Sequence, residues 1–171
     1  MTKFAGNCTD LKGQIFDCSN YKQADSYVNT VKWISKYIGT KYKHGGNIRA
    51  SIMNEDVFDV PQPAVPAVAD LNNPTTDEQF ELQVYDKEID AYVKQRSILA
   101  DNVQKAYSLI LGQCTDLLQL KLKQQANWAN VSASQDAIQL LNLIKSIAFR
   151  FEDQKFLPLA LYHAKLHLYS F

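Results

Sequence analysis

Four of the five prolines lie between residues 61 and 74, where they separate two stretches of helical periodicity. Proline lacks an amide hydrogen and disfavours helical geometry at the residue before it. We therefore expect residues 56–74 to form an extended linker between an N-terminal helical unit at 1–55 and a C-terminal helical unit at 75–171. Because strand signals are weak, the predicted fold class is an all-α bundle of about five helices.

The N-terminal unit contains an amphipathic helix predicted at residues 20–38, where apolar side chains recur three or four positions apart. We expect Ser19 or Asn20 to cap the first turn and Gly39 to end the helix in a left-handed conformation. Gly45 and Gly46 are interpreted as a flexible turn. The stripe consists of Tyr21, Ala24, Val28, Val31, Ile34 and Ile38, widened by Tyr27 and Trp33.

The C-terminal unit is predicted to begin with a long helix that ends at Gly112. Thr75 and Glu78 stand at capping-box spacing directly after Pro74. Arg96 interrupts the apolar seam, which indicates either a buried polar contact or a kink. The seam consists of Tyr85, Ile89, Tyr92, Leu99, Val103, Ala106 and Ile110.

Three shorter helices complete the predicted bundle. One starts at Thr115, a second starts at a capping box of Ser132 and Gln135, and a last one starts near Pro158. The first is expected to turn Leu117, Leu118 and Leu122 inward, and the second has the stripe Ile138, Leu141, Ile144, Ile147 and Phe151.

Few residues are suited to catalysis or metal binding. The histidines are His44, His163 and His167, and no nucleophile motif such as GxSxG accompanies them. His163 and His167 have the i, i+4 spacing of two zinc ligands, but HAKLH lacks the glutamate of HExxH, so we interpret them as a polar stripe. We predict a protein that is not an enzyme and has no cofactor, metal site or small-molecule substrate.

The charge balance and the cysteine content limit the classes of partner and the cellular compartment that suit the chain. Eighteen basic and eighteen acidic residues give a formal net charge of zero, which favours self-association. The three cysteines form no CxxC pair, as expected in a reducing compartment. No segment approaches the ~20 apolar residues that span a bilayer, and a signal peptide is not evident. We expect a cytoplasmic protein that does not contact a membrane.

A local cluster of basic and aromatic residues is the candidate for weak RNA contact. RNA bases stack on aromatic rings while lysines pair with phosphates. The same residues are also typical of a helix whose lysines face solvent while its aromatic rings pack against the core. We favour this second interpretation. The candidate residues are Lys32, Trp33, Lys36, Lys41 and Lys43.

Two long helical segments are LADNVQKAYSLILGQCTDLLQLKLKQQANW at residues 99–128 and SQDAIQLLNLIKSIAFRFEDQKFLPLALYHAKLHLYSF at residues 134–171. Together they resemble the Gag region of copia-type LTR retrotransposons. The N-terminal text FAGNCTDLKGQIFDC, followed by YKQADSYVNTVKWISKYIGTKYKHGGNIRASI, is also similar to some Gag proteins of this group. The matching landmarks are Ala106, Leu109, Ile110, Leu111, Leu117, Leu118, Asp136, Ala137 and the leucine-rich stretch 157–168.

The resemblance implies a structural protein with an all-α capsid domain that assembles into a shell around element RNA. The chain departs from the family pattern where Leu140 or Leu141 replaces a common tryptophan, and a CCHC knuckle is absent from it. The family also continues past the leucine-rich helix with further helices of the capsid unit, so the chain resembles a truncated N-terminal Gag fragment. The predicted partner is a second copy, through Leu159, Tyr162, Leu166 and Tyr169.

A different class of function also fits the sequence. The chain is alternatively a host-adapted helical module that binds a protein or RNA through residues 20–43 and the proline-rich linker. Binding of RNA that weakens steeply with salt distinguishes this hypothesis from an assembly protein.

Overall fold

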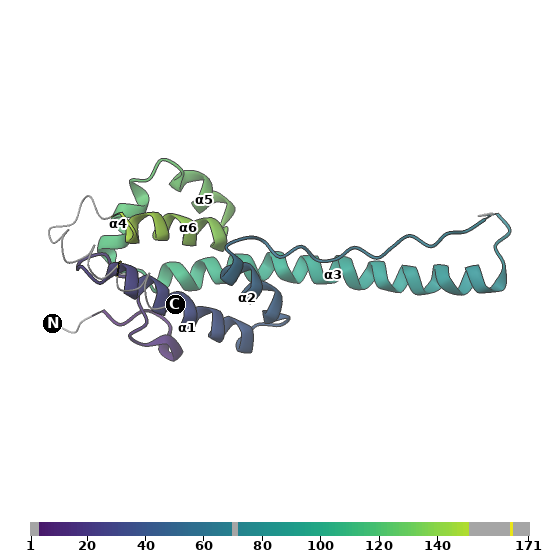
Figure 1. Ribbon diagram of the computed structural model, residues 1–171, viewed down its shortest axis with the longest axis horizontal. Coiled ribbons are helices and arrows are strands. Elements are labelled where there is room, and N and C mark those ends of the chain that lie inside the picture. Colours follow the sequence, from purple (N-terminus) through teal and green to yellow (C-terminus); the bar gives the residue numbers. More distant parts are fainter. Residues whose placement is uncertain (1–3, 70–71, 151–164, 166–171) are drawn as a thin grey trace.

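The computed structural model describes residues 4–69, 72–150 and Lys165. Within these residues the chain forms six α-helices and one short 3-10 helix without a β-sheet, which confirms the predicted all-α fold class (Figure 1). The elements are η1 (Thr9–Leu11), α1 (Gln23–Lys41), α2 (Gly45–Asn54), α3 (Thr76–Gly112), α4 (Asp116–Lys123), α5 (Trp128–Ser134) and α6 (Ala137–Ala148).

Several sequence-based predictions fall outside the described residues. These are the helix expected from Pro158, the position of Phe151 and the placement of His163 and His167. The predicted self-association residues Leu159, Tyr162, Leu166 and Tyr169 also lie outside them.

Helix α1 forms where the periodicity predicts a helix, but its ends and its buried face differ. Its N-cap is Lys22, which makes no side-chain cap, so the predicted cap at Ser19 or Asn20 is wrong. Gly39 lies inside the helix, which continues to Lys41. The buried face is formed by Gln23, Tyr27, Thr30, Ile34, Ser35 and Ile38, whereas Val28 and Trp33 are 54% and 46% exposed.

The glycine pair after α1 is not a flexible turn, because Gly45 and Gly46 are the first residues of α2. Gly45 is buried, and a Cβ added there would collide with the carbonyl oxygen of Ile38. Glycine therefore allows the start of α2 to touch the end of α1. The two helices pack closely against each other, and Ile48 and Ile52 of α2 enter the core.

Helix α3 is 37 residues long, which corresponds to about 55 Å. The predicted capping box is confirmed: the Glu78 amide donates to Thr75 at 3.3 Å, and Glu78 accepts from the Thr75 amide at 2.7 Å. Arg96 is exposed, so the predicted buried contact is wrong, and α3 continues through it without a break. Its guanidinium donates to the Tyr92 hydroxyl at 3.3 Å.

The three helices after α3 are only partly as predicted. Thr115 caps α4 as expected, but Leu117 is 44% exposed and only the other two predicted leucines are buried. The capping box expected at Ser132 and Gln135 is wrong, because residues 128–134 form the separate helix α5 and Gln135 is left-handed. Asp136 instead caps α6, accepting from the Ile138 amide at 2.8 Å.

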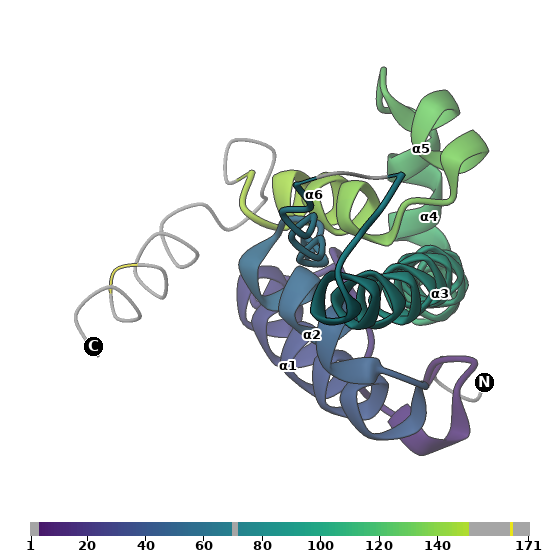
Figure 2. The ribbon, with the colours of Figure 1, turned by 90° about the vertical axis from the view of Figure 1, so that its right-hand side faces the viewer.

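One hydrophobic core joins the N-terminal segment, α1, α2, the second half of α3, α4, α5 and α6. Helix α3 packs against α6 and α2, and α1 packs against α2 and α6 (Figure 2). Both helical units inferred from the sequence contribute to this core. Its largest fully buried side chains are Phe16, Ile34, Ile38, Ile48, Ile52, Ile110, Gln113, Leu118, Leu122, Leu140, Leu141 and Ile144.

The first half of α3 projects beyond the other helices, and the proline-rich segment lies alongside it (Figure 1). Described residues 57–69 form neither helix nor strand, and no described residue between 61 and 98 is buried. We define residues 61–69 and 72–98 as the arm. Residues 4–60 and 99–150 form the body, whose core ends at Val60 and Leu99.

Candidate interaction surfaces

An open apolar groove lies on the arm between the proline-rich segment and α3. Val65 and Phe80 are 73% and 67% exposed, the two largest exposed fractions among the large apolar side chains that the structure describes. The groove has a volume of about 340 Å³. Its apolar lining is Ala64, Val65, Pro66, Phe80, Val84 and Tyr85, and Glu81 and Glu88 border it. Such a surface is suited to a partner that offers apolar side chains beside basic ones.

Glu78 fastens the two sides of the arm at its far end. One carboxylate oxygen accepts from the Ala69 amide at 2.9 Å, and the other accepts from the Thr75 amide at 2.7 Å. These hydrogen bonds, the Ala69 bond first, hold the pKa of the Glu78 carboxyl below its usual range. Glu78 therefore caps α3 and also holds the proline-rich segment in place to form the groove.

The arm is strongly acidic near its tip. Residues 76–90 contain six acidic side chains and one basic side chain. Glu81, Asp86, Glu88 and Asp90 are all exposed along α3. The field around the apolar groove is therefore negative, although the whole chain has no net charge.

The opposite charge gathers on α1 and α2, where residues 28–54 contain five basic side chains and no acidic one. Lys32, Trp33 and Lys36 share the exposed side of α1, and the Lys36 ammonium lies 5.3 Å from the centroid of the Trp33 ring. Because Trp33 is exposed, the favoured interpretation of a packed aromatic stripe is wrong for this residue. Tyr37 and Tyr42 do pack against the core.

The five predicted RNA-contact residues do not form one cluster. Lys41 lies at the end of α1, where its ammonium is 3.6 Å from a carboxylate oxygen of Asp10. Lys43 follows the helix, and its carbonyl oxygen accepts from the side chain of Asn102 at 2.8 Å. Only Lys32, Trp33 and Lys36 therefore share one helix face.

Arg49 extends this surface and was missed in the sequence. Its side chain lies over Gly39, with Cδ 2.9 Å from the position that a Cβ of Gly39 would occupy. Gly39 stands one turn after Lys36 on α1. The run without acidic residues from 28 to 54 is the signal that identifies it. We define Val28, Lys32, Trp33, Lys36 and Arg49 as the basic face.

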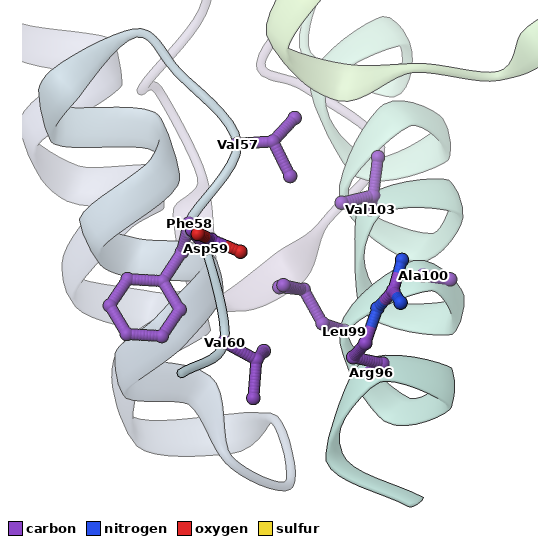
Figure 3. A pocket seen from close by; sticks show the side chains of 8 residues that line it. All are labelled: Val57, Phe58, Asp59, Val60, Arg96, Leu99, Ala100 and Val103. Carbon is purple, nitrogen blue, oxygen red and sulfur yellow. The ribbon is translucent and has the colours of Figure 1, made fainter. Parts of the chain in front are cut away.

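A second pocket of about 260 Å³ lies where the chain leaves the body, between residues 57–60 and α3 (Figure 3). Val57 and Val60 point toward α3 and Leu99 points toward the linker, whereas the Phe58 ring points to the other side. Asp59 and Arg96 are its only charged lining residues. Its lining residues include no nucleophile paired with a base.

The remaining reactive groups in the described part of the chain are not assembled into a site. Among the described residues, no group of three His, Cys, Asp or Glu side chains could hold a metal ion. Burial raises the pKa of the Cys18 and Cys114 thiols, which keeps them protonated and weakly nucleophilic. No helix within the described ranges has the length and hydropathy needed to cross a membrane.

Comparison with known proteins gives no relative. No protein-family model matches the chain, and no curated protein or solved structure is significantly similar to it. The resemblance to Gag therefore stays a prediction.

Proposed function

We propose that the chain is a non-enzymatic, Gag-like structural protein of the cytoplasm that self-associates into capsid-like particles. The observation that carries the proposal is the arm, which exposes an apolar groove away from the core. The all-α fold and the residues that resemble Gag support the same function. Contact between copies is its mode of action, and it needs no active site.

Burial of the exposed groove supplies hydrophobic free energy for self-association. Burying a valine or phenylalanine side chain contributes about 1.5–3 kcal/mol. Val65 and Phe80 together therefore offer several kcal/mol that an isolated copy leaves unused. Contacts of this strength hold an assembly together when each copy makes more than one of them.

Light scattering coupled to size-exclusion chromatography tests the proposal. We expect the mass of the wild-type chain to rise with concentration. In the double variant of the two groove residues, Val65→Ser with Phe80→Ser, the measured mass should rise only at a higher protein concentration. Val93→Ser is the matched control, because Val93 is 58% exposed on the same arm but does not line the groove. A wild-type chain that stays monomeric at all concentrations contradicts the proposal.

The exposure of Trp33 favours a second candidate function, contact with RNA. Lys36 lies over the exposed ring and Lys32 precedes it on the same exposed side of α1, which suits stacking of a base with pairing of its phosphates. RNA binding should quench Trp33 fluorescence in a Trp128→Phe background and weaken steeply with salt. Neutralising Lys32 and Lys36 to Gln should reduce the salt slope, whereas Lys105→Gln on α3 should not. Quenching that is independent of salt contradicts this function.

A further inference from the structure

The two exposed surfaces of the chain have opposite charge. The arm carries six acidic side chains and one basic side chain over residues 76–90, and residues 28–54 carry five basic side chains and no acidic one. Lys41, which is not part of the basic face, pairs with Asp10. Within the part of the chain that the structure describes, Lys32, Lys36 and Arg49 form no such ion pair, so the basic face keeps its positive charge. Opposite potentials on two surfaces guide them toward contact.

Both surfaces also expose apolar side chains among the charges. The groove offers Val65 and Phe80, and the basic face offers Val28 and Trp33, at 54% and 46% exposure. The acidic Glu81 and Glu88 border the groove, while Lys36 lies over the Trp33 ring and Lys32 is exposed on the same side of α1. An apolar centre with a charged border is the usual composition of a protein interface.

We infer that the arm of one copy docks on the basic face of a second copy, with Trp33 of the second copy facing the groove. The inference rests on the proposed self-association and names the two surfaces that meet. Pairing of two arms is disfavoured, because it brings two acidic tips together. Pairing of two basic faces is disfavoured for the same reason.

The contact joins two different surfaces, so it is heterologous. Each copy in a docked pair still has one free arm or one free basic face, so that further copies can add. Heterologous contacts generate rings when the rotation between copies closes, and extended assemblies when it does not. Because both surfaces are exposed, added salt should weaken the contact.

Paired charge reversals in the full chain test the inference. The arm variant combines Glu81→Lys with Glu88→Lys, and the face variant combines Lys32→Glu with Lys36→Glu. We expect each variant alone to need on the order of tenfold more protein for half-association than the wild type does. An equimolar mixture should regain association, because it contains one unchanged acidic arm and one unchanged basic face.

The outcomes separate this inference from the proposed function. If the face variant associates like the wild type while the arm variant does not, the arm docks elsewhere and the inference is wrong, although self-association stands. Failure of the mixture to recover also overturns it. A monomeric wild type overturns the proposed function as well.

Lys12→Glu with Lys105→Glu is the control of equal charge change. Circular dichroism verifies folding, and the milder Lys32→Gln with Lys36→Gln should weaken association in the same direction.

Discussion

The side-chain oxygen of Gln113 accepts a hydrogen bond from the Cys8 amide at 3.0 Å, across 105 positions of sequence. The side-chain nitrogen of Gln113 donates to the carbonyl oxygens of Leu11, at 3.1 Å, and Gln14, at 2.7 Å. Gln113 is fully buried, so water does not supply these bonds. One side chain at the end of α3 thus fixes the N-terminal segment to the body.

Gln113→Leu should lower the free energy of unfolding by about 2–4 kcal/mol, because it removes the partner of three backbone groups in one buried and two partly buried hydrogen bonds. Urea denaturation measures this change. A loss below about 0.5 kcal/mol, the scale of an ordinary surface substitution, would show that the Gln113 bonds do not hold the segment.

Gly6 lies against the Gln113 side chain, and its φ is +92°. An added Cβ there would collide with that side chain. Gly6→Ala should therefore cost roughly 3 kcal/mol, the sum of backbone strain and overpacking. Gly13→Ala is the matched control, because Gly13 has a φ of +85° but nothing within 4 Å of its added Cβ. It should cost only about 1 kcal/mol. Equal thermal destabilisation of the two variants would refute the close contact.

Asp136 is the helix cap that the structure shows in place of the predicted capping box. Asp136→Ala should lower stability by about 1 kcal/mol, because the Ile138 and Gln139 amides lose their acceptor. Ser132 lies inside α5, so Ser132→Ala should change stability by less than about 0.5 kcal/mol. Chemical denaturation of both variants measures the difference, and the reverse order would favour the capping box.

The lowered pKa of Glu78 makes the end of the arm sensitive to acid. Because the folded pKa lies below the ordinary value of 4.5, the stabilisation is complete above that value and is lost as the pH falls through the folded pKa. The Ala69 amide resonance should therefore titrate with a midpoint below 4.5. In Glu78→Gln this titration should disappear. A midpoint at or above 4.5 would mean that the Ala69 and Thr75 bonds are absent.

The sequence predicts α1, α3 and α6 because their apolar residues follow the helical period. It does not predict α2, because a glycine such as Gly45 usually indicates a turn. Here glycine is required because two helices approach each other closely. The helix boundary at Gln135 is not predicted either, because its left-handed conformation interrupts a stretch whose sequence pattern is helical. Local patterns describe single helices, but these features depend on contacts between helices.

The candidate surfaces were only partly predictable for the same reason. Lys32, Trp33 and Lys36 are visible as a basic and aromatic cluster, but the periodicity places Trp33 in the buried stripe. The structure exposes it because the packed side of α1 is centred on Ile34 and Ile38. The groove combines residues near 65 with residues near 80, and no local pattern indicates that these two segments lie side by side.

Negative-stain electron microscopy of the purified chain at high concentration tests the central claim most directly. Self-association into capsid-like particles predicts closed particles of regular size for the wild type. These particles should be lost when Val65 and Phe80 are both replaced by serine, and kept with Val93→Ser. A field of single molecules or shapeless aggregates from folded wild-type protein would contradict the account.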